Sequence, residues 1–153
     1  MSDAWLVRAA TRADLQVWAQ LRQALWPDGD LAGHADDIEE QLAKPERAGA
    51  FLAVDEDGIA FGFAEATVRG DYVNGTESSP VAFLEGWYVR PQYQHRGAGR
   101  ALIAAIESWA SECGCSELAS DALLDNLSAH RAHEACGFEE TERVVYFRRV
   151  LSP

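Results

Sequence analysis

The segment 94–100 combines glycine and arginine at a spacing that suits a phosphate group, and its sequence is QHRGAGR. Glycine allows the backbone to curl tightly, so that successive N–H groups converge on one point. The segment also opens a predicted helix, whose N-terminus adds hydrogen-bond donors and the positive end of the helix dipole. Arg96 and Arg100 can add charge-assisted contacts. This pattern predicts a pyrophosphate site, and an ordinary glycine turn before a helix is the alternative.

Two common nucleotide-binding motifs do not account for this segment. The ATP-binding P-loop requires Gly-Lys-Ser/Thr, which the sequence lacks. The dinucleotide fingerprint G-x-G-x-x-G requires a third glycine at the position where Leu102 stands. The glycine segment therefore belongs to neither of these two nucleotide-binding classes.

The charge of the chain limits the partners it can bind. The sequence contains 13 Lys and Arg residues against 25 Asp and Glu residues, which gives a net charge of −12. Such a field repels the phosphates of nucleic acids and anionic membranes, so neither partner is expected. It would attract a polycationic substrate, although the charge can also serve only solubility.

The cysteines and the absence of long apolar segments favour a cytoplasmic protein. No stretch of about 18 apolar residues predicts a transmembrane helix, and residues 1–6 do not resemble a secretory signal. Cys113, Cys115 and Cys136 make an odd number, which argues against a disulfide framework. A zinc site would need a second pair of ligands. We therefore expect reduced cysteines that pack in the core, and no metal.

The pattern of apolar residues predicts one α/β domain that spans residues 1–153. Its elements alternate in a way that suits one mixed sheet with helices packed on it. Strands are expected at residues 5–9, 50–54, 59–68, 81–89, 117–121 and 140–151, and helices at residues 11–25, 34–43, 98–113 and 126–136.

Three segments together resemble the GNAT superfamily of acetyl-CoA-dependent N-acetyltransferases. Gln94-x-x-Gly97-x-Gly99 matches the glycine motif of that family, and the strand before it ends in Val89-Arg90-Pro91. The segment from Asn126 to Gly137-Phe138 matches a further family motif. The resemblance implies a mixed, mostly antiparallel sheet flanked by helices, with two strands splayed apart at the acetyl-CoA cleft. The residues that it implies for acetyl-CoA binding are Trp87, Val89, Gln94, Arg96, Gly97, Ala98, Gly99, Arg100 and Asn126.

One position departs from the family pattern. The family often has a tyrosine seven residues after the asparagine, where it can protonate the leaving thiolate, and His133 stands there in this chain. Histidine can donate a proton or a hydrogen bond. It can equally pack against the coenzyme without an acid role.

Further local segments are similar to those of the aminoglycoside 6′-N-acetyltransferases, an antibiotic-resistance branch of the superfamily. These segments are 21–27, 71–75, 83–86, 119–121 and 137–143. The resemblance implies acetylation of the 6′-amine of an aminoglycoside. It also implies a homodimer in which C-terminal strands pack across the interface.

A polycationic acceptor would need carboxylates that are not neutralised by Lys or Arg. Glu85, Asp121 and Glu142 are the candidates, with a structural ion pair, a helix N-cap and a solvated strand face as their respective alternatives. Trp26 and Tyr72 can stack on sugar faces, although Trp26 can also be a core residue. The acidic residues of segment 36–40 would lie at the rim.

The expected reaction is direct attack of a neutral amine on the thioester. The N–H of Val89 would hold the thioester oxygen, Glu85 or Asp121 would accept the amine proton, and His133 would act as the acid. The alternatives are a related enzyme that acetylates a polyamine, another small amine or a protein N-terminus, and a non-catalytic acyl-CoA-binding module.

Overall fold

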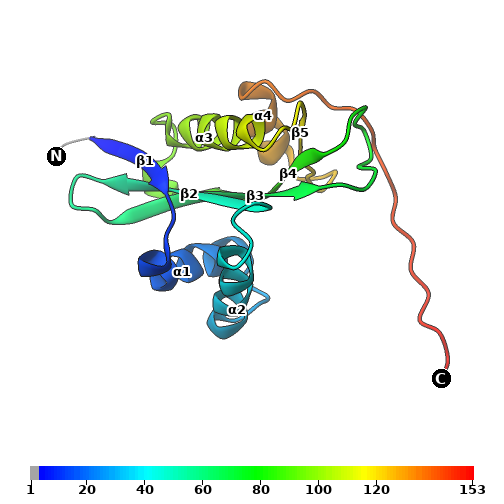
Figure 1. Cartoon of the computed structure of the whole chain (residues 1–153), viewed down its shortest axis with the longest axis horizontal. Coiled ribbons are helices and arrows are strands. Elements are labelled where there is room, and N and C mark those ends of the chain that lie inside the picture. Colours follow the sequence, from blue (N-terminus) through cyan, green and yellow to red (C-terminus); the bar gives the residue numbers. More distant parts are fainter. Residues whose placement is uncertain (1–3) are drawn as a thin grey trace.

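Five strands form one sheet in the order β1-β2-β3-β4-β5. The computed structural model describes residues 4–153, and Figure 1 shows the sheet edge-on between two layers of helices. The first four strands pair antiparallel, whereas β4 and β5 are parallel. The predicted mixed, mostly antiparallel sheet is therefore confirmed. The strand bounds are Trp5–Ala9 (β1), Ala48–Asp55 (β2), Ala60–Arg69 (β3), Val81–Val89 (β4) and Leu118–Ala119 (β5).

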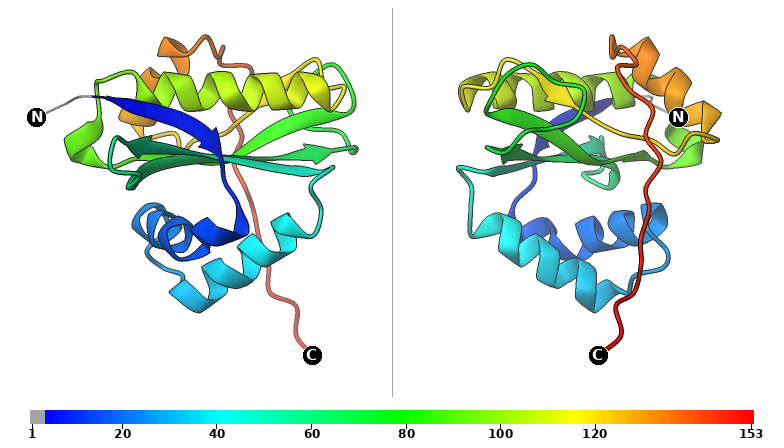
Figure 2. Two further views of the ribbon diagram at one scale, coloured as in Figure 1. Left: turned by 60° about the vertical axis from the view of Figure 1, so that its left-hand side comes forward. Right: turned by 90° about the vertical axis from the view of Figure 1, so that its right-hand side faces the viewer.

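Helices cover both faces of the sheet. Helices α1 (Leu15–Leu25) and α2 (Leu31–Leu42) pack on one face, and α3 (Ala98–Glu112) and α4 (Leu127–Ala135) lie on the other (Figure 2). Helix α2 begins earlier than the sequence predicted, because the side chain of Asp30 accepts a hydrogen bond of 2.7 Å from the N–H of Gly33 and caps the first turn. Between residues 4 and 153, no helix is long and apolar enough to cross a membrane.

Each face of the sheet has its own hydrophobic core. Phe61 packs with the α3 residues Leu102 and Ile106 on one face. Phe63 packs with Trp18 and other residues of α1 and α2 on the opposite face. Residues two apart in a regular strand lie on the same face of the sheet. A shift in the register of β2 and β3 beside Phe61 places Phe61 and Phe63 on opposite faces.

Strands β4 and β5 diverge soon after they meet. Only two residue pairs join them, Ala82 with Leu118 and Phe83 with Ala119, whereas β4 continues to Val89. The short β5 replaces the longer strand predicted at residues 117–121. The second half of β4 thus has β3 on one side and an open edge on the other, so the predicted splaying of the strands is confirmed.

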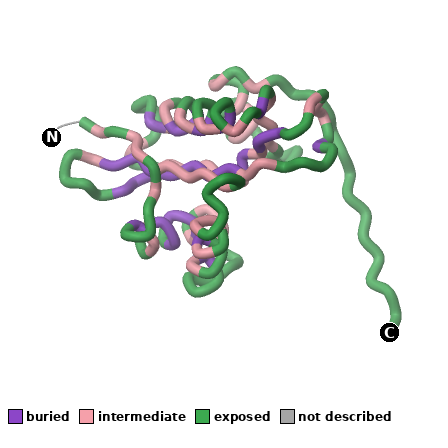
Figure 3. Tube along the Cα trace, viewed as in Figure 1, coloured by how far each residue is buried: buried purple, intermediate pink, exposed green. Residues whose placement is uncertain are grey.

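The strand predicted at residues 140–151 is absent from the structure of this chain. The last fifteen residues form no helix or strand, and they run away from the sheet as an exposed segment (Figure 3). Their apolar side chains lie in solvent, with Val145 77%, Tyr146 82% and Phe147 91% exposed. A β-strand requires a neighbour to satisfy its backbone groups, and this chain alone provides none for the segment.

Candidate active site

A glycine turn builds the N-terminus of α3. Gly97 is the N-cap of this 15-residue helix and has a φ of +89°, in the left-handed region that side chains disfavour. The turn is tied to β4 by two hydrogen bonds, from the Trp87 indole Nε1 to the Gly99 carbonyl (3.1 Å) and from the Gln94 amide to the Val89 carbonyl (2.9 Å). The helix N-terminus therefore lies beside the open end of β4, where its N–H groups can bind an anion.

The hydrogen-bond pattern of β4 directs the N–H of Val89 away from β3. Arg90 donates its N–H to the carbonyl of Phe61 at 2.9 Å, so these two residues form a hydrogen-bonded pair of the antiparallel ladder. Such pairs alternate with pairs that exchange no hydrogen bonds, and Val89 with Gly62 is the next pair. The Val89 N–H consequently points to the open side between β4 and β5, which suits the thioester oxygen of an acyl donor.

The remaining predicted coenzyme residues surround the same end of the sheet. Arg96 lies over the ring of Tyr93, with 5.5 Å from its guanidinium carbon to the ring centroid, and Tyr93 stacks on Phe61. Arg96 and Arg100 are exposed, whereas the Ala98 side chain is buried in the core. Ala98 can therefore contribute only its backbone to a ligand.

Asn126 and His133 both have structural partners on α4. Asn126 caps the helix, because its Oδ1 accepts a hydrogen bond of 3.2 Å from the N–H of Ala129. Because the cap uses only the side-chain oxygen, the Nδ2 of Asn126 can still donate to a ligand. This cap is the role that the sequence analysis considered for Asp121.

His133 is held by contacts on both ring nitrogens. Its Nδ1 lies 2.6 Å from the Ala129 carbonyl, which can only accept, so Nδ1 carries a proton. Its Nε2 lies 2.8 Å from the Ser120 hydroxyl, just after β5. The ring also contacts Trp87 edge-on. His133 therefore joins α4 to the end of β5 at the edge of the β4–β5 opening.

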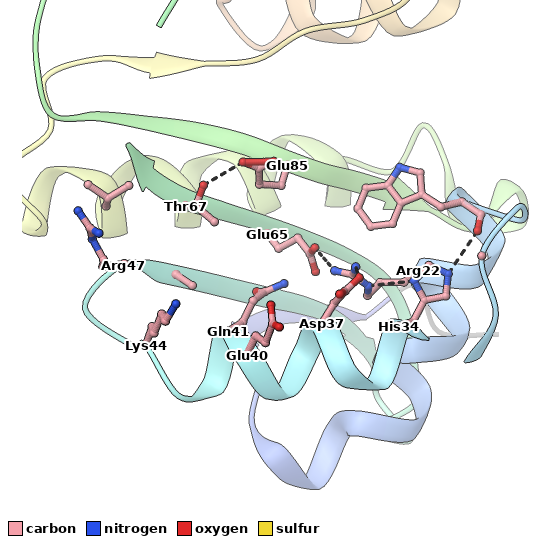
Figure 4. A pocket seen from close by; sticks show the side chains of 14 residues that line it. Arg22, His34, Asp37, Glu40, Gln41, Lys44, Arg47, Glu65, Thr67 and Glu85 are labelled. Atoms are coloured by element: carbon pink, nitrogen blue, oxygen red, sulfur yellow. Dashed lines mark hydrogen bonds and ion pairs between the residues drawn. The ribbon is translucent and has the colours of Figure 1, made fainter. Parts of the chain in front are cut away.

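A pocket of about 560 Å³ lies between α2 and the sheet, on the face opposite α3 (Figure 4). Its volume is typical of a site for a small molecule. Two of the predicted acceptor-binding residues, Trp26 and Glu85, line it together. The indole of Trp26 packs directly on Gly86 of β4. A Cβ atom at position 86 would be only 2.6 Å from the Cη2 atom of Trp26. The aromatic wall of the pocket therefore depends on a glycine in β4.

Glu85 forms an ion pair, the role that the sequence analysis gave as its alternative, and the partner is Arg69. Its Oε1 accepts hydrogen bonds from the Arg69 guanidinium (2.6 Å) and from the Thr67 hydroxyl (2.9 Å), both on β3. The side chain remains 30% exposed, and it borders the pocket together with Thr67 (Figure 4). The carboxylate is accessible to a ligand, but it is not free of cations as the sequence analysis expected.

The other three predicted acceptor-binding residues lie outside this pocket. Tyr72 is 74% exposed and borders an adjacent hollow, which shares Arg47 and Val68 with the pocket. Asp121 is exposed beyond the end of β5, and Glu142 lies in the exposed C-terminal segment. This chain alone thus brings together only part of the predicted acceptor site.

A buried ion pair beneath the pocket was not predicted. The guanidinium of Arg22 on α1 donates to Glu65 on β3, and the side chains are 7% and 3% exposed. The indole of Trp18 donates to the second oxygen of Glu65 at 3.0 Å. Burial raises the pKa of Glu65, and the neighbouring Arg22 guanidinium opposes that shift. Nothing local in the sequence pairs Arg22 with a residue 43 positions away.

No metal site is built from the part of the chain that the structure describes: residues 4–153 contain no cluster of three His, Cys, Asp or Glu side chains placed to hold an ion.

Comparison with known sequences identifies close relatives over the full length. The acetyltransferase (GNAT) family matches residues 15–138. An aminoglycoside N(6′)-acetyltransferase type 1 of Stenotrophomonas maltophilia is 56% identical over 100% of this chain and 98% of its own length. A protein of the same description from Serratia marcescens is 49% identical over 90% of this chain and 94% of its own length.

Solved structures agree with the sequence comparison. The structure of AAC(6′)-Iy in complex with the bisubstrate analog CoA-S-monomethyl-acetylneamine has a TM-score of 0.91 and 42% sequence identity, and the match covers 97% of this chain and 99% of that one. The aminoglycoside antibiotic 6′-N-acetyltransferase AAC(6′)-Ih from Acinetobacter baumannii has a TM-score of 0.90 and 39% identity, with 97% and 100% covered.

Proposed function

Because the chain belongs to the acetyltransferase (GNAT) family and, within it, to the aminoglycoside N(6′)-acetyltransferases of type 1, we propose that it transfers the acetyl group of acetyl-CoA to the 6′-amine of an aminoglycoside. The observation that carries this proposal is the 56% identity that extends over the whole chain. The AAC(6′)-Iy structure at 42% identity contains a CoA-linked acetylneamine, which joins both substrates in one molecule. The physiological role would be antibiotic resistance.

Acetyl-CoA would bind at the open edge of β4. The pyrophosphate would bind to the N–H groups at the start of α3, with Arg96 and Arg100 nearby, and Asn126 would donate to the pantetheine arm. This is supported by the left-handed turn at Gly97 and by the short β4–β5 pairing. The outward N–H of Val89 would stabilise the negative charge that develops on the thioester oxygen during attack.

The acceptor must lose a proton, because only a neutral amine can attack the thioester. Glu85 or Asp121, directly or through a water molecule, would accept that proton. The position of Glu85 beside Trp26 in one pocket supports the first assignment. Replacement of each carboxylate, as Glu85→Gln and Asp121→Asn, tests the assignment. Near-full turnover in both variants would show that neither residue is the base.

His133, at the edge of the β4–β5 opening, would protonate the leaving thiolate. In the neutral ring its Nδ1 holds the proton and its Nε2 accepts from Ser120. A second proton taken up from solvent on Nε2 would reverse the hydrogen bond to Ser120, and His133 could then donate that proton to the thiolate and become neutral again. His133→Phe keeps an aromatic ring for Trp87 to contact and removes the proton. A fall in kcat of about 100-fold with an unchanged KM for acetyl-CoA would support the acid role.

The protein would act as a homodimer. The exposed apolar side chains of the C-terminal segment, such as Tyr146 and Phe147, need cover, and the extended segment has backbone groups that a second copy could pair. Light scattering during gel filtration of the full chain tests this. A monomer at the concentrations used for turnover would refute it.

The cytoplasm is the proposed place of action. The three cysteines are free thiols at Cys113, Cys115 and Cys136, and thiols persist in a reducing compartment. Fractionation of cells that produce the protein would test this proposal.

The proposed activity is tested by the release of free thiol from acetyl-CoA with four acceptors, which are kanamycin, tobramycin, spermidine and a short peptide. Turnover with the two aminoglycosides alone, followed by identification of the acetylated nitrogen by NMR, would establish the reaction. Turnover with spermidine or the peptide alone would refute the proposed acceptor while leaving acetyl-CoA binding intact.

A further inference from the structure

The pocket beneath α2 contains polar groups that the transfer reaction itself does not require. Helix α2 directs Asp37, Glu40 and Gln41 toward β3 in this pocket (Figure 4). These residues lie on a different element from Glu85, which is the carboxylate proposed to act at the reacting amine. We propose, on the basis of the proposed function, that Asp37 and Gln41 form a recognition subsite for a second polar group of the acceptor, an ammonium or a hydroxyl on a ring other than the acetylated one.

The first support is the way in which Asp37 is held. Its Oδ2 accepts a hydrogen bond of 2.9 Å from Arg22, yet its side chain is 59% exposed. A carboxylate has two oxygens that can accept several hydrogen bonds, so a fixed Asp37 retains acceptor capacity toward the pocket. Its orientation is set before a ligand arrives, which reduces the entropy lost on binding.

The second support is the buried ion pair behind Asp37. Glu65 balances the charge of Arg22 inside the protein, because the two side chains are 3% and 7% exposed and in contact. His34 also accepts from the Nε of Arg22 through its Nδ1, at 3.2 Å. Arg22 is thus fixed from three sides, and the charge of Asp37 remains available to a cation in the pocket.

The third support is an unused acceptor on Gln41. Its Oε1 atom is buried and has no hydrogen-bond partner among residues 4–153, although its side chain hydrogen-bonds to Glu65. A buried oxygen without a partner is costly, and Gln41 lines the pocket. An N–H or O–H donor on a bound acceptor would satisfy this oxygen after a rotation of the Gln41 side chain that turns the oxygen toward the pocket.

The two groups together select the chemistry of the ligand. Asp37 and Gln41 Oε1 only accept hydrogen bonds, so they fit a donor group and favour a positive charge. Lys44 and Arg47, at the other end of the pocket, would repel an ammonium and leave the Asp37 end as its place. A ligand with two separated amines would satisfy both Glu85 and Asp37, and a ligand with one amine would not.

The test compares Asp37→Asn with Asp36→Asn. Both changes remove one negative charge from adjacent positions of α2, but Asp36, which the sequence analysis expected at the rim, does not line the pocket. The asparagine at position 37 can still accept from Arg22, so the support for the helix is kept. With kanamycin, Asp37→Asn should raise the acceptor KM about fivefold to tenfold, since the lost contact is a partly exposed charged hydrogen bond. The kcat of Asp37→Asn and its KM for acetyl-CoA should not change. Asp36→Asn should change none of these constants.

A one-amine acceptor provides the second arm. With methyl 6-amino-6-deoxyglucoside, Asp37→Asn and the wild type should have the same KM, because this molecule has no second ring. Equal KM values for both variants with kanamycin would overturn the subsite. An equal increase with the one-ring acceptor would also overturn it, because Asp37 would then act on the acetylated ring.

Calorimetric titration of kanamycin in the presence of CoA separates the subsite from the activity. Weaker kanamycin binding in Asp37→Asn than in Asp36→Asn, with no turnover by the wild type, would leave the subsite standing and refute the proposed reaction. Turnover by the wild type with identical kanamycin affinities in both variants would refute the subsite alone.

Discussion

Replacing Gly97 by alanine should damage the coenzyme site through the backbone and not through a clash. The φ of Gly97 is +89°, and an ideal Cβ there would be 3.7 Å from the nearest atom, the Cζ2 of Trp5, which is an ordinary contact. The cost is therefore that of placing an L-residue in the left-handed region, about 1–2 kcal/mol. For a chain of this size the melting temperature should fall by about 2–8 °C, and relaxation of the turn should raise the KM for acetyl-CoA.

Gly99→Ala is the matched control, two residues away in the first turn of α3. Its φ is not in the left-handed region, and its Cβ would be 3.5 Å from the Trp87 ring. Alanine is favoured over glycine in helices by up to about 1 kcal/mol, so this variant should keep or raise the free energy of unfolding. Thermal unfolding and the KM for acetyl-CoA measured on both variants test the reasoning. Equal stability of Gly97→Ala and the wild type would refute it, because the turn would then not need a positive φ.

Three further variants test the interior and the pocket. Glu65→Ala leaves a buried guanidinium without its partner, so urea denaturation should report a loss of about 3–5 kcal/mol; a loss below 1 kcal/mol would contradict the buried pair. Hydrogen bonds from Arg8 lower the pKa of Asp14 from 3.8 to about 2, so this group contributes about 2 kcal/mol of stability above pH 4, which is lost as the pH falls from 4 to 2. Asp14→Asn should flatten that part of the stability curve, and an unchanged curve would refute the assignment. Gly86→Ala places a Cβ 2.6 Å from the Trp26 ring, so the acceptor KM should rise while the KM for acetyl-CoA does not; an unchanged acceptor KM would show that the indole does not shape the site.

The features that could be predicted from the sequence depend on neighbours along the chain. The strand Val81–Val89 was predicted to the residue, because a largely apolar segment ends shortly before Pro91. The glycine turn before α3 and the start of α4 near Asn126 are also local, since a positive φ and a capping hydrogen bond involve only three or four residues. Such features can be recognised from one sequence.

The features that were missed depend on register between strands and on distant helices. Glu85 was preferred as a carboxylate free of cations, with an ion pair as the alternative, and β3 places Arg69 beside it through a pairing that no local pattern specifies. Arg22 and Glu65 meet because α1 lies across β3, and polarity alone suggested no buried position for either. The strand predicted at residues 140–151 is rich in β-branched and aromatic residues, yet a strand forms only where another strand is available to pair with it.

The net charge of −12 and the charge of the pocket have different consequences for an acceptor. Four carboxylates and three cationic side chains line the pocket, which leaves one net negative charge there. Most of the excess charge is therefore spread over the surface, where it can raise the rate at which a polycation arrives and where salt screens it. Selection among cations must then come from fixed directions, such as those of Asp37 and Glu85, and not from the total charge. High salt should thus slow association with the acceptor more than it changes the preference between acceptors with one and two amines.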